Sequence, residues 1–403
     1  MKAKNKRVAA LALATALTFS LSAPFTLPQA RATDNTSVSM NVRSSEDLAT
    51  LVNPIVQKYT VDDSQQTWVM SPSTRLAVLA TQENVENERL AEVVKLVNSE
   101  FVEKEVVSST PFTMVYANEE DVASADVLIK LDTDSSLYDG SESTEAYRID
   151  IGADGVVITA ASENAVMYAL RTVQNYMVAN DGLPYGTIVD YPDVAERRLH
   201  VDCARKYISK DWFIRQIREM SFLKMNAIQI HFSENLGFRI ECETDPSIVS
   251  DEYLTKDEVR EILAEAEKYG VKVIPSFDSP GHVDQILRAH PEYGQISNKG
   301  SHYKSGLDVT NPEAVEYIYS LYDEYMELFE GCTDFHIGGD EYMEFDRAPF
   351  TTEYKSVLND YAKKTLGSEY QWKDVLANYI NELAEYVHSK GFTPRVWNDG
   401  LYY

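Results

Sequence analysis

The sequence predicts an α/β protein: an incomplete (β/α)8-type barrel preceded by a small α+β domain. Three observations predict this fold. Strand-like and helix-like segments alternate after residue 195, polar residues follow several of these strands directly, and the order before residue 190 is mixed. Alternating strands and helices form a parallel sheet, either doubly wound or closed into a barrel. A doubly wound nucleotide-binding sheet carries a Gly-rich turn after its first strand, and the absence of that turn favours the barrel.

Residues 1–32 are expected to be a signal peptide. A basic start, MKAKNKR, is followed by the apolar run VAALALATALTFSLSAPF and by Ala30-Arg31-Ala32, an Ala-x-Ala cleavage site. A membrane anchor is the alternative, but the apolar run is short and no stop-transfer flank follows it. The pattern is of bacterial type and predicts a secreted or cell-surface protein that is not inserted in a membrane after cleavage.

Residues 33–190 are expected to form the N-terminal α+β domain. ADVLIKLD reads as a strand, and YRIDIGADGVVITA reads as two strands joined by an Ala-Asp-Gly turn. SENAVMYALRTVQNYM then places apolar residues at helical spacing. Strands followed by a helix indicate a helix packed on a sheet. The Gly, Pro and Asp residues of DGLPYGTIVDYPD mark the junction to the second domain.

Residues 195–403 are expected to form the barrel. Its predicted strands are RRLHVDC, AIQIHFS, VKVIPSFD, DFHIGG and TPRVW. Thr255 with Glu258 forms a capping box for one intervening helix, and Asn311 caps another that has Pro312 at its first position. The sequence stops at Tyr403 after about five strands, whereas a complete barrel has eight. We therefore expect the C-terminal part of the barrel to be missing from this chain.

Composition limits the possible partners. The chain has 403 residues and a net charge of −27, which argues against binding nucleic acid or an anionic membrane surface, because both require clustered cations. The chain has three cysteines, Cys203, Cys242 and Cys332, and their spacing fits neither a zinc knuckle nor a CxxC pair. We expect them to be small buried hydrophobic residues. The oligomeric state is open.

Carboxylates and amides gather where the predicted strands end, and the stretch DFHIGGDEY is the clearest case. Its two glycines allow close approach of a ligand or a neighbouring backbone to Asp340 and Glu341. Further polar residues follow the other strands: Asp202, Glu234, Asp278, Asn398 and Asp399. One crowded carboxylic acid that holds its proton beside another that stays ionised suits glycoside hydrolysis. Exposed capping residues are the alternative for an isolated Asp-Glu pair.

Several ordered motifs resemble glycoside hydrolase family 20, the β-N-acetylhexosaminidases. FHIGGDEY looks like the signature of that family, and RRLHVDCAR is similar to its Arg-Gly-x-x-x-Asp-x-x-Arg first strand. LKMNAIQIHFSENLGFRIE, VIPSFDSPGH and VWNDGL are similar to its second, third and fifth strands. EAYRIDIGADGVVITAASENAVMYALRTVQ resembles the small domain that precedes these barrels. The resemblance thus covers most of the chain.

The resemblance implies a secreted enzyme that removes terminal β-linked GlcNAc or GalNAc from glycans by a retaining, substrate-assisted mechanism without cofactor or metal. Glu341 would be the general acid/base, and Asp340 would orient the substrate's 2-acetamido group, which acts as the nucleophile. The implied substrate-binding residues are Arg197, Glu234, Asp278, His282, His336 and Trp397. In this picture His282 lies near the acid, Glu234 holds His282, and Trp397 walls the acetamido pocket.

Departures from the family pattern leave alternatives open. Glu234-Asn235 stands where the family has Asp-Asp, Arg198 replaces a glycine, and the family's later pocket residues would lie beyond Tyr403. A lacto-N-biosidase that releases a disaccharide and a catalytically impaired carbohydrate-binding fragment are the close alternatives. A metal hydrolase is less favoured because zinc motifs are absent; it would use Asp202, Asp278, His282, His336 and Asp340. Trp372 is a further candidate pocket aromatic, although packing on a helix explains it as well.

Overall fold

The computed structural model describes residues 44–64, 66–71, 73–79, 87–103, 113–117, 125–180 and 182–398. The signal peptide expected over residues 1–32 and the strand-end residue Asp399 lie outside these ranges. Within the described residues, no helix is both long enough and apolar enough to cross a membrane.

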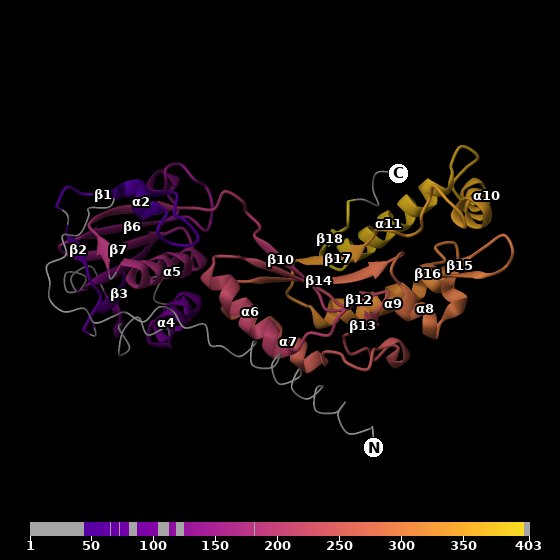
Figure 1. The fold of residues 1–403 in the computed structure, drawn as a ribbon, viewed down its shortest axis with the longest axis horizontal. Helices are drawn as coiled ribbons and strands as arrows, with labels where there is room; N and C mark the ends of the chain where they lie inside the picture. The colour runs from indigo at the N-terminus through magenta and orange to yellow at the C-terminus, as the bar shows by residue number, and fades with distance from the viewer. Residues whose placement is uncertain are drawn as a thin grey trace, which may run out of the picture. The chain divides into compact units, whose positions relative to one another are not determined.

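The N-terminal part is an α+β domain with one seven-stranded sheet, ordered β1-β9-β6-β7-β5-β3-β4. Its strands are β1 Lys58–Val61, β3 Arg75–Leu79, β4 Thr113–Ala117, β5 Val127–Leu131, β6 Tyr147–Gly152, β7 Gly155–Ala160 and β9 Gly186–Asp190. The predicted hairpin is confirmed, since β6 pairs with β7 antiparallel from Tyr147 opposite Ala160 to Gly152 opposite Gly155. Helix α5, Glu163–Asn180, packs on β6 and β7, and helix α4, Glu88–Glu103, packs beside α5 (Figure 1).

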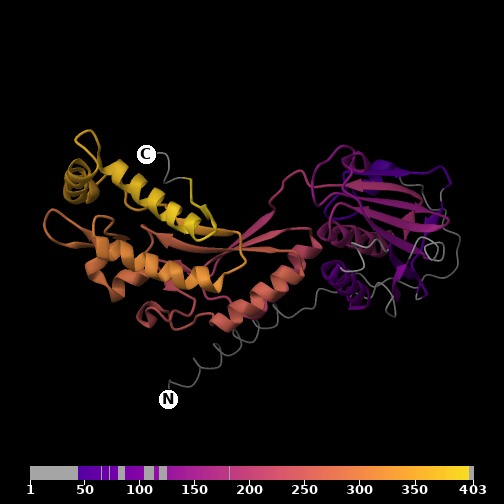
Figure 2. The ribbon, with the colours of Figure 1, turned by 180° about the vertical axis from the view of Figure 1, so that it is seen from behind.

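The C-terminal part contains a second sheet, which is the described portion of a (β/α)-type barrel, as predicted. Its five strands are all parallel and ordered β10-β11-β14-β17-β18. They span Arg198–Asp202, Ala227–His231, Lys272–Ser279, Asp334–Gly338 and Thr393–Arg395. The connecting helices are α6 Lys210–Phe222, α7 Lys256–Lys268, α9 Pro312–Leu328 and α11 Trp372–Ser389. Seen from behind, α11 lies along β17 and β18 (Figure 2).

Local signals in the sequence explain where these helices begin. The Thr255 side chain accepts a hydrogen bond from the backbone of Glu258, and the Glu258 side chain caps Thr255 in return, so the predicted capping box is confirmed. Asn311 caps α9, and Pro312 takes its first position, as predicted. Helix α7 is followed by Gly270 with φ of +67°, the left-handed conformation expected after a helix.

The chain leaves the regular barrel pattern in three segments that follow strands. The short strands β12, Ser233–Glu234, and β13, Gly237–Phe238, form a hairpin after β11. Helix α8, Asp284–Ala289, and a hairpin of β15, Gly294–Ile296, with β16, His302–Leu307, follow β14. Helix α10, Lys355–Thr365, follows β17. All three segments therefore extend from the carboxyl edge of the sheet, where barrel enzymes place their active sites.

Side-chain alternation along the strands separates an aromatic layer from a polar interior. Phe277 on β14 and Phe335 on β17 stack at 5.6 Å between ring centroids, and Phe277 also stacks on Tyr325 of α9 at 4.3 Å. Because successive side chains of a strand point to opposite faces, their neighbours Asp278 and His336 point into the barrel. The hydrophobic core of this domain thus lies between the sheet and its helices.

Ion pairs join residues at the amino ends of β10, β14 and β17 to one another and to Arg395 of β18. The Arg395 guanidinium binds both carboxylate oxygens of Glu196, at 2.8 and 2.7 Å, and also binds Asp334 at 2.6 Å. Lys272 Nζ lies 3.0 Å from Glu196 and 2.9 Å from Asp334. Glu196 precedes β10 and Arg395 ends β18, so this group links the two outermost strands of the described sheet across its interior.

Gly338, the last residue of β17, allows β14 and β17 to approach closely. Its φ is +78°, and a Cβ added there would lie 2.8 Å from the Cα and Oδ1 of Asp278 and from the backbone nitrogen of Ser279. Real Cβ atoms do not approach backbone this closely, so any larger residue would displace Asp278 or the end of β17.

We predict that Gly338→Ala lowers the free energy of unfolding by ~3 kcal/mol, because left-handed backbone strain and a steric clash add together. Urea unfolding of the full chain measures this change. Gly331→Ala is the matched control: its φ is +95°, but nothing lies within 4 Å of an added Cβ. The control should cost only ~1 kcal/mol. Equal losses in the two variants would contradict the close approach.

Candidate active site

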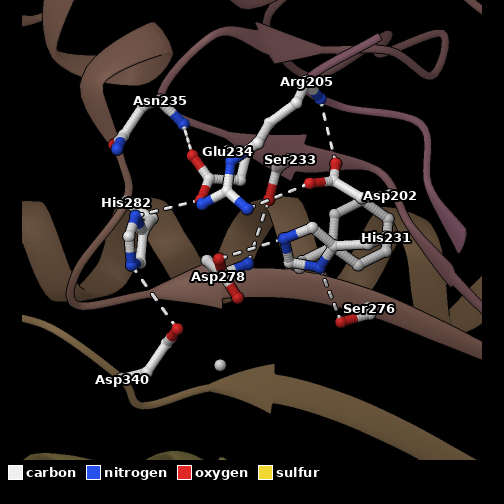
Figure 3. Close-up of polar contacts among 12 residues, drawn as sticks. Asp202, Arg205, His231, Ser233, Glu234, Asn235, Ser276, Asp278, His282 and Asp340 are labelled. Carbon is white, nitrogen blue, oxygen red and sulfur yellow. Dashed lines mark hydrogen bonds and ion pairs between the residues drawn. The ribbon is translucent and has the colours of Figure 1, made fainter. Parts of the chain in front are cut away.

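The carboxyl edge of the barrel sheet brings together most of the predicted site residues. Glu234 comes from the β12–β13 hairpin, Asp278 from β14, His282 from the segment after β14, and Asp340 and Glu341 follow β17. Figure 3 shows His282 between Glu234 and Asp340, with Asp278 beside His231. Residues from three stretches distant in sequence, around Glu234, Asp278–His282 and Asp340–Glu341, therefore converge on one group, as strand-end placement predicts.

The backbone after β17 explains how two adjacent acids reach one partner. On a regular strand Asp340 and Glu341 would point to opposite faces. The strand ends at Gly338, however, and Gly338, Gly339 and Glu341 have φ of +78°, +97° and +38°. The chain therefore turns, and both carboxylates approach His282 Nε2, at 3.4 Å for Asp340 Oδ2 and 3.3 Å for Glu341 Oε2.

A left-handed backbone at Glu341 costs on the order of 1–3 kcal/mol, because the conformation is unfavourable for a residue with a side chain. His282 is strained in the same way, with φ of +56°. Such strain persists where the surrounding structure imposes it, and it concentrates at functional sites. The two strained residues here are the two whose side chains meet.

The two acids differ in exposure, and His282 acts strongly on the titration of Asp340. The Asp340 side chain is 21% exposed, whereas that of Glu341 is 71% exposed. Burial alone would raise the pKa of Asp340, but the hydrogen bond and charge of His282 outweigh it and hold this pKa below its usual value. Asp340 is therefore the acid that stays ionised, while Glu341 reaches solvent.

His282 is held as a cation between carboxylates. Its Nδ1 lies 3.0 Å from Glu234 Oε1, on the side opposite Asp340 and Glu341. Burial would lower the pKa of His282, but Asp340 and Glu234 raise it to about 11. A histidine with both ring nitrogens facing carboxylates donates from both, so it is doubly protonated at neutral pH.

Arg205 is the second cation of the site, and it is not among the site residues predicted from the sequence. Its guanidinium donates to Glu234 and to Asp202 Oδ2, the latter at 3.2 Å, and its side chain is 53% exposed. Arg205 lies three residues beyond Asp202, the last residue of β10. Asp202 was selected because polar residues at the carboxyl ends of parallel strands gather at one edge of the sheet. The same reason applies to Arg205, which lies in the turn after β10.

The structure places Arg197 away from this group. It precedes β10, and the five residues of that strand separate the two ends by roughly 16 Å at about 3.3 Å per residue. Its guanidinium binds Glu145 of the α+β domain at 2.6 Å and the Lys224 carbonyl at 2.8 Å, and it lies 5.8 Å from the Tyr168 ring centroid. The sugar-binding role expected for Arg197 is therefore not supported by its position, and Arg205 occupies the place expected for it.

Asp278 and His231 form a buried pair beneath these groups. His231 Nε2 lies 3.1 Å from Asp278 Oδ2, and the exposed fractions of the two side chains are 5% and 2%. Burial raises the pKa of Asp278. Burial would lower the pKa of His231, but the Asp278 carboxylate outweighs that effect and raises it. His231 Nδ1 lies 2.9 Å from Ser276 Oγ, which fixes the orientation of the ring.

His336 and Trp397 lie in the barrel interior. Their ring centroids are 4.3 Å apart, and the Trp397 ring also meets His200 at 5.4 Å. Burial lowers the pKa of His336 to about 3, so its ring is neutral. Its Nδ1 accepts a 3.2 Å hydrogen bond from the Gly338 backbone, which leaves the proton on Nε2. Their roles in substrate binding stay predictions.

A metal site finds partial support in geometry. Among the described residues, one group of potential ligands has its donor atoms within 4.8 Å of one another: His231, Glu234 and Asp278. This group shares only Asp278 with the metal ligands suggested by the sequence. Its carboxylates already have side-chain partners. Asp278 faces His231, and Glu234 faces both Arg205 and His282. Arg205 and protonated His282 therefore neutralise Glu234, and Asp278 is already paired with His231, so the arrangement favours acid–base chemistry.

Trp372 lies at the start of α11 and is 5% exposed. It packs on Phe345 and Phe350 at 4.5 and 4.8 Å between ring centroids, so packing explains it, as the sequence suggested. It also lines a pocket next to Glu341. The three cysteines are unpaired; Cys203 and Cys242 are buried, as expected, and Cys332 is partly exposed.

The geometry predicts how His282 titrates. NMR should show its imidazole titrating above pH 10, and Glu234→Gln should lower the midpoint, because one of the two facing carboxylates loses its charge. Since folding raises this pKa, the protonated ring contributes stability fully below about pH 6.5, and that contribution is lost as pH rises toward about 11. Titration near pH 6.5 in the unaltered protein would contradict the paired geometry.

Comparisons with known proteins identify a family. Residues 196–403 match the model of glycosyl hydrolase family 20, catalytic domain, and residues 50–191 match that of domain 2 of the same family. Over 280 residues the chain is 31% identical to a lacto-N-biosidase of Bifidobacterium bifidum, covering 68% of this chain and 24% of the relative. It is 28% identical to β-hexosaminidase subunit A2 of Dictyostelium discoideum, covering 64% of this chain and 48% of that one. The chain thus spans about half the length or less of these relatives.

Solved structures show the same fold. A Flavobacterium johnsoniae chitobiase matches with a TM-score of 0.69 and 23% identity, covering 88% of this chain and 53% of that protein. A Streptomyces plicatus β-hexosaminidase variant, solved in complex with the product GlcNAc, matches with a TM-score of 0.65 and 21% identity, covering 89% and 67%.

Proposed function

This chain belongs to glycosyl hydrolase family 20, and from that premise we propose that it removes β-linked N-acetylhexosamine from the ends of glycans with retention of configuration. The observation that carries the proposal is the convergence of Asp340 and Glu341 on a protonated His282. One of these acids is held ionised and the other is exposed. That difference gives each acid a separate task.

Glu341 is the general acid. Its exposed carboxyl group donates a proton to the glycosidic oxygen as the bond from that oxygen to C1 of the sugar breaks. The carbonyl oxygen of the substrate's own 2-acetamido group attacks C1 from the opposite face and forms an oxazolinium ion. Glu341, now ionised, takes a proton from a water molecule, which attacks C1 and reopens the ring. Two inversions at C1 produce net retention.

Asp340 stabilises the nucleophile. Because His282 keeps it ionised, the carboxylate accepts a hydrogen bond from the acetamido N–H and offsets the positive charge that develops on the oxazolinium ring. His282 in turn is oriented by Glu234. His282 and Glu234 are therefore positioning residues in this proposal, since they act through Asp340.

Arg205 provides donors for sugar hydroxyls. Its guanidinium is half-exposed, and Asp202 and Glu234 fix its plane, so its remaining N–H groups are pre-oriented toward a ligand at the sheet edge. The product GlcNAc bound to the Streptomyces plicatus relative supports a pyranose as the ligand of this site.

Two related functions are alternatives to the release of a single terminal sugar. Release of a disaccharide is favoured by the 31% identity to a lacto-N-biosidase. A carbohydrate-binding protein without catalysis is disfavoured, because binding alone needs no exposed acid beside an ionised one. Export belongs to the same proposal and is supported by the basic, apolar and Ala-x-Ala segments of residues 1–32.

We predict that Glu341→Gln lowers kcat for an aryl 2-acetamido-β-glycoside by roughly 10²–10⁴-fold, because the amide has no proton to donate. Binding of GlcNAc, measured by calorimetry, should persist. Glu344→Gln is the matched control: it removes an exposed carboxylate three residues away, which pairs with Arg347, and should leave kcat unchanged. Full activity of Glu341→Gln would show that another group is the acid.

The substrate-assisted step has a separate test in the substrate. A 2-hydroxy aryl glycoside lacks the internal nucleophile, so we expect its turnover to be lower than that of the 2-acetamido substrate by roughly 10³-fold or more, the size of effect expected when an intramolecular attack is lost. Steady-state rates of the two substrates at equal concentrations measure the ratio. Comparable rates would overturn substrate assistance while leaving a glycosidase.

A further inference from the structure

The strained backbone of Glu341 lies between two residues whose contacts can fix it. Its φ of +38° is unfavourable for a residue with a side chain, and such a conformation persists only where neighbouring contacts impose it. Before Glu341, the Gly339 backbone N–H donates to the Ser279 carbonyl at 3.0 Å, which ties the chain to the end of β14. After Glu341 comes Tyr342, which has no task in the proposed mechanism. Its contacts therefore decide whether the following side of the strained residue is fixed as well.

The Tyr342 side chain is anchored in the β15–β16 hairpin. It is 4% exposed, and its hydroxyl oxygen lies 2.7 Å from Gln295 Oε1 and 2.9 Å from the Leu307 carbonyl oxygen. The single proton of the hydroxyl is shared between these two acceptors. Gln295 and Leu307 are both fully buried. Because a buried acceptor that loses its donor is costly, these contacts keep the tyrosine in one position.

Two glycines let the surrounding backbone pack directly against Tyr342. A Cβ added at Gly306 of β16 would lie 2.8 Å from Cε2 of the tyrosine ring. A Cβ added at Gly281 would lie 3.1 Å from the Cα and the backbone nitrogen of Tyr342. Tyr342 is therefore enclosed by backbone from the hairpin and by backbone from the segment that carries His282.

Leu307 connects the two strained residues of the site. Its backbone N–H donates to the Pro280 carbonyl at 2.8 Å, while its own carbonyl accepts from Tyr342. Pro280 lies two residues before His282, and Tyr342 follows Glu341 directly. One buried residue thus holds both segments whose side chains meet, with 3.3 Å between His282 Nε2 and Glu341 Oε2.

The position of the Glu341 carboxyl group depends on this backbone. Because 71% of the side chain is exposed, packing contributes little to where it lies. A general acid must come within about 3 Å of the oxygen that it protonates, and a displacement of about 1 Å can lower a rate by ~10²-fold. Burial raises the pKa of the Tyr342 hydroxyl well above its usual value, so this group stays protonated. Tyr342 can therefore affect proton transfer through position and not by exchanging a proton itself.

We propose that Tyr342 is a positioning residue for the general acid. Its hydroxyl is the contact through which the β15–β16 hairpin holds the backbone of Glu341, so that the carboxyl group reaches the glycosidic oxygen. The inference rests on the proposed function and adds to it a residue that acts through Glu341. Loss of the hydroxyl should weaken proton donation, while the internal nucleophile, which Asp340 serves, stays in place.

The test uses two aryl 2-acetamido-β-glucosides whose leaving groups differ in their need for a proton. Phenolate is a poor leaving group and depends on the acid, whereas 2,4-dinitrophenolate departs without protonation. In the full chain, Tyr342→Phe keeps the ring and removes the hydroxyl. It should lower kcat/KM for the phenyl glycoside about tenfold, less than complete loss of a general acid would, and leave the value for the dinitrophenyl glycoside within about twofold.

Gln295→Met changes the same contact from the hairpin side, because it removes the amide that accepts from Tyr342. It should produce the same selective loss, smaller in size because the Leu307 carbonyl still accepts from the hydroxyl. The double variant should lose no more than Tyr342→Phe alone, since both changes remove one shared hydrogen bond. Losses that add in full would contradict a role through this contact.

Tyr176→Phe is the matched control. It removes another fully buried hydroxyl that donates to a backbone carbonyl, that of Leu48 at 2.7 Å, in the α+β domain. It should lower the free energy of unfolding, as Tyr342→Phe does, and change the turnover of neither glycoside. Equal losses on both glycosides in Tyr342→Phe, or no loss on either, would overturn the positioning role.

NMR tests the geometry without turnover. Because Glu341 Oε2 lies 3.3 Å from His282 Nε2, a displaced carboxyl group should shift the ¹⁵N resonance of this nitrogen in Tyr342→Phe and not in Tyr176→Phe. An unshifted resonance would overturn the proposal whatever the rates. Failure of the proposed function is distinguishable, since the unaltered protein would then hydrolyse neither glycoside, while the resonance would still report the position of Glu341.

Discussion

The site depends on two cations placed among carboxylates that would otherwise repel one another. Asp202, Glu234 and Asp340 end or follow separate strands, and parallel strands bring their carboxyl ends to one edge. Arg205 bridges the first two acids, and protonated His282 bridges the last two. Burial alone would raise the pKa values of Glu234 and Asp340, and the hydrogen bonds and charge of His282 outweigh burial and keep these two acids ionised.

The strands that build the hydrophobic core with one face supply the polar residues of the barrel interior with the other. On β17, Phe335 joins an aromatic layer toward α9, while its neighbour His336 contacts Trp397 inside the barrel. A two-residue period thus lets one short strand stabilise the fold on one face and build a site on the other. A change of register by one residue would exchange these two layers.

The sequence was sufficient for features with local causes. The capping box at Thr255, the β6–β7 hairpin and the strand-end acids followed from spacing and residue type. The contacts that each residue makes around the sheet were harder to predict from the sequence. Arg197 and Arg205 both flank β10, and only tertiary contacts show that Glu145 takes the first and Glu234 the second. The pocket beside Glu341 was equally hidden, because it depends on how residues from two loops and a helix meet.

The ion pairs at the amino ends of the strands bear on how the protein is made. Glu196 and Arg395 are 199 residues apart in sequence, yet their side chains bind through two hydrogen bonds. Contacts of such long range form slowly, because a long loop must close before they contribute. On a ribosome, the α+β domain is synthesised before the barrel and can fold first. The sheet acquires this link only after Arg395 emerges from the ribosome, when β10, β11, β14 and β17 have already been synthesised.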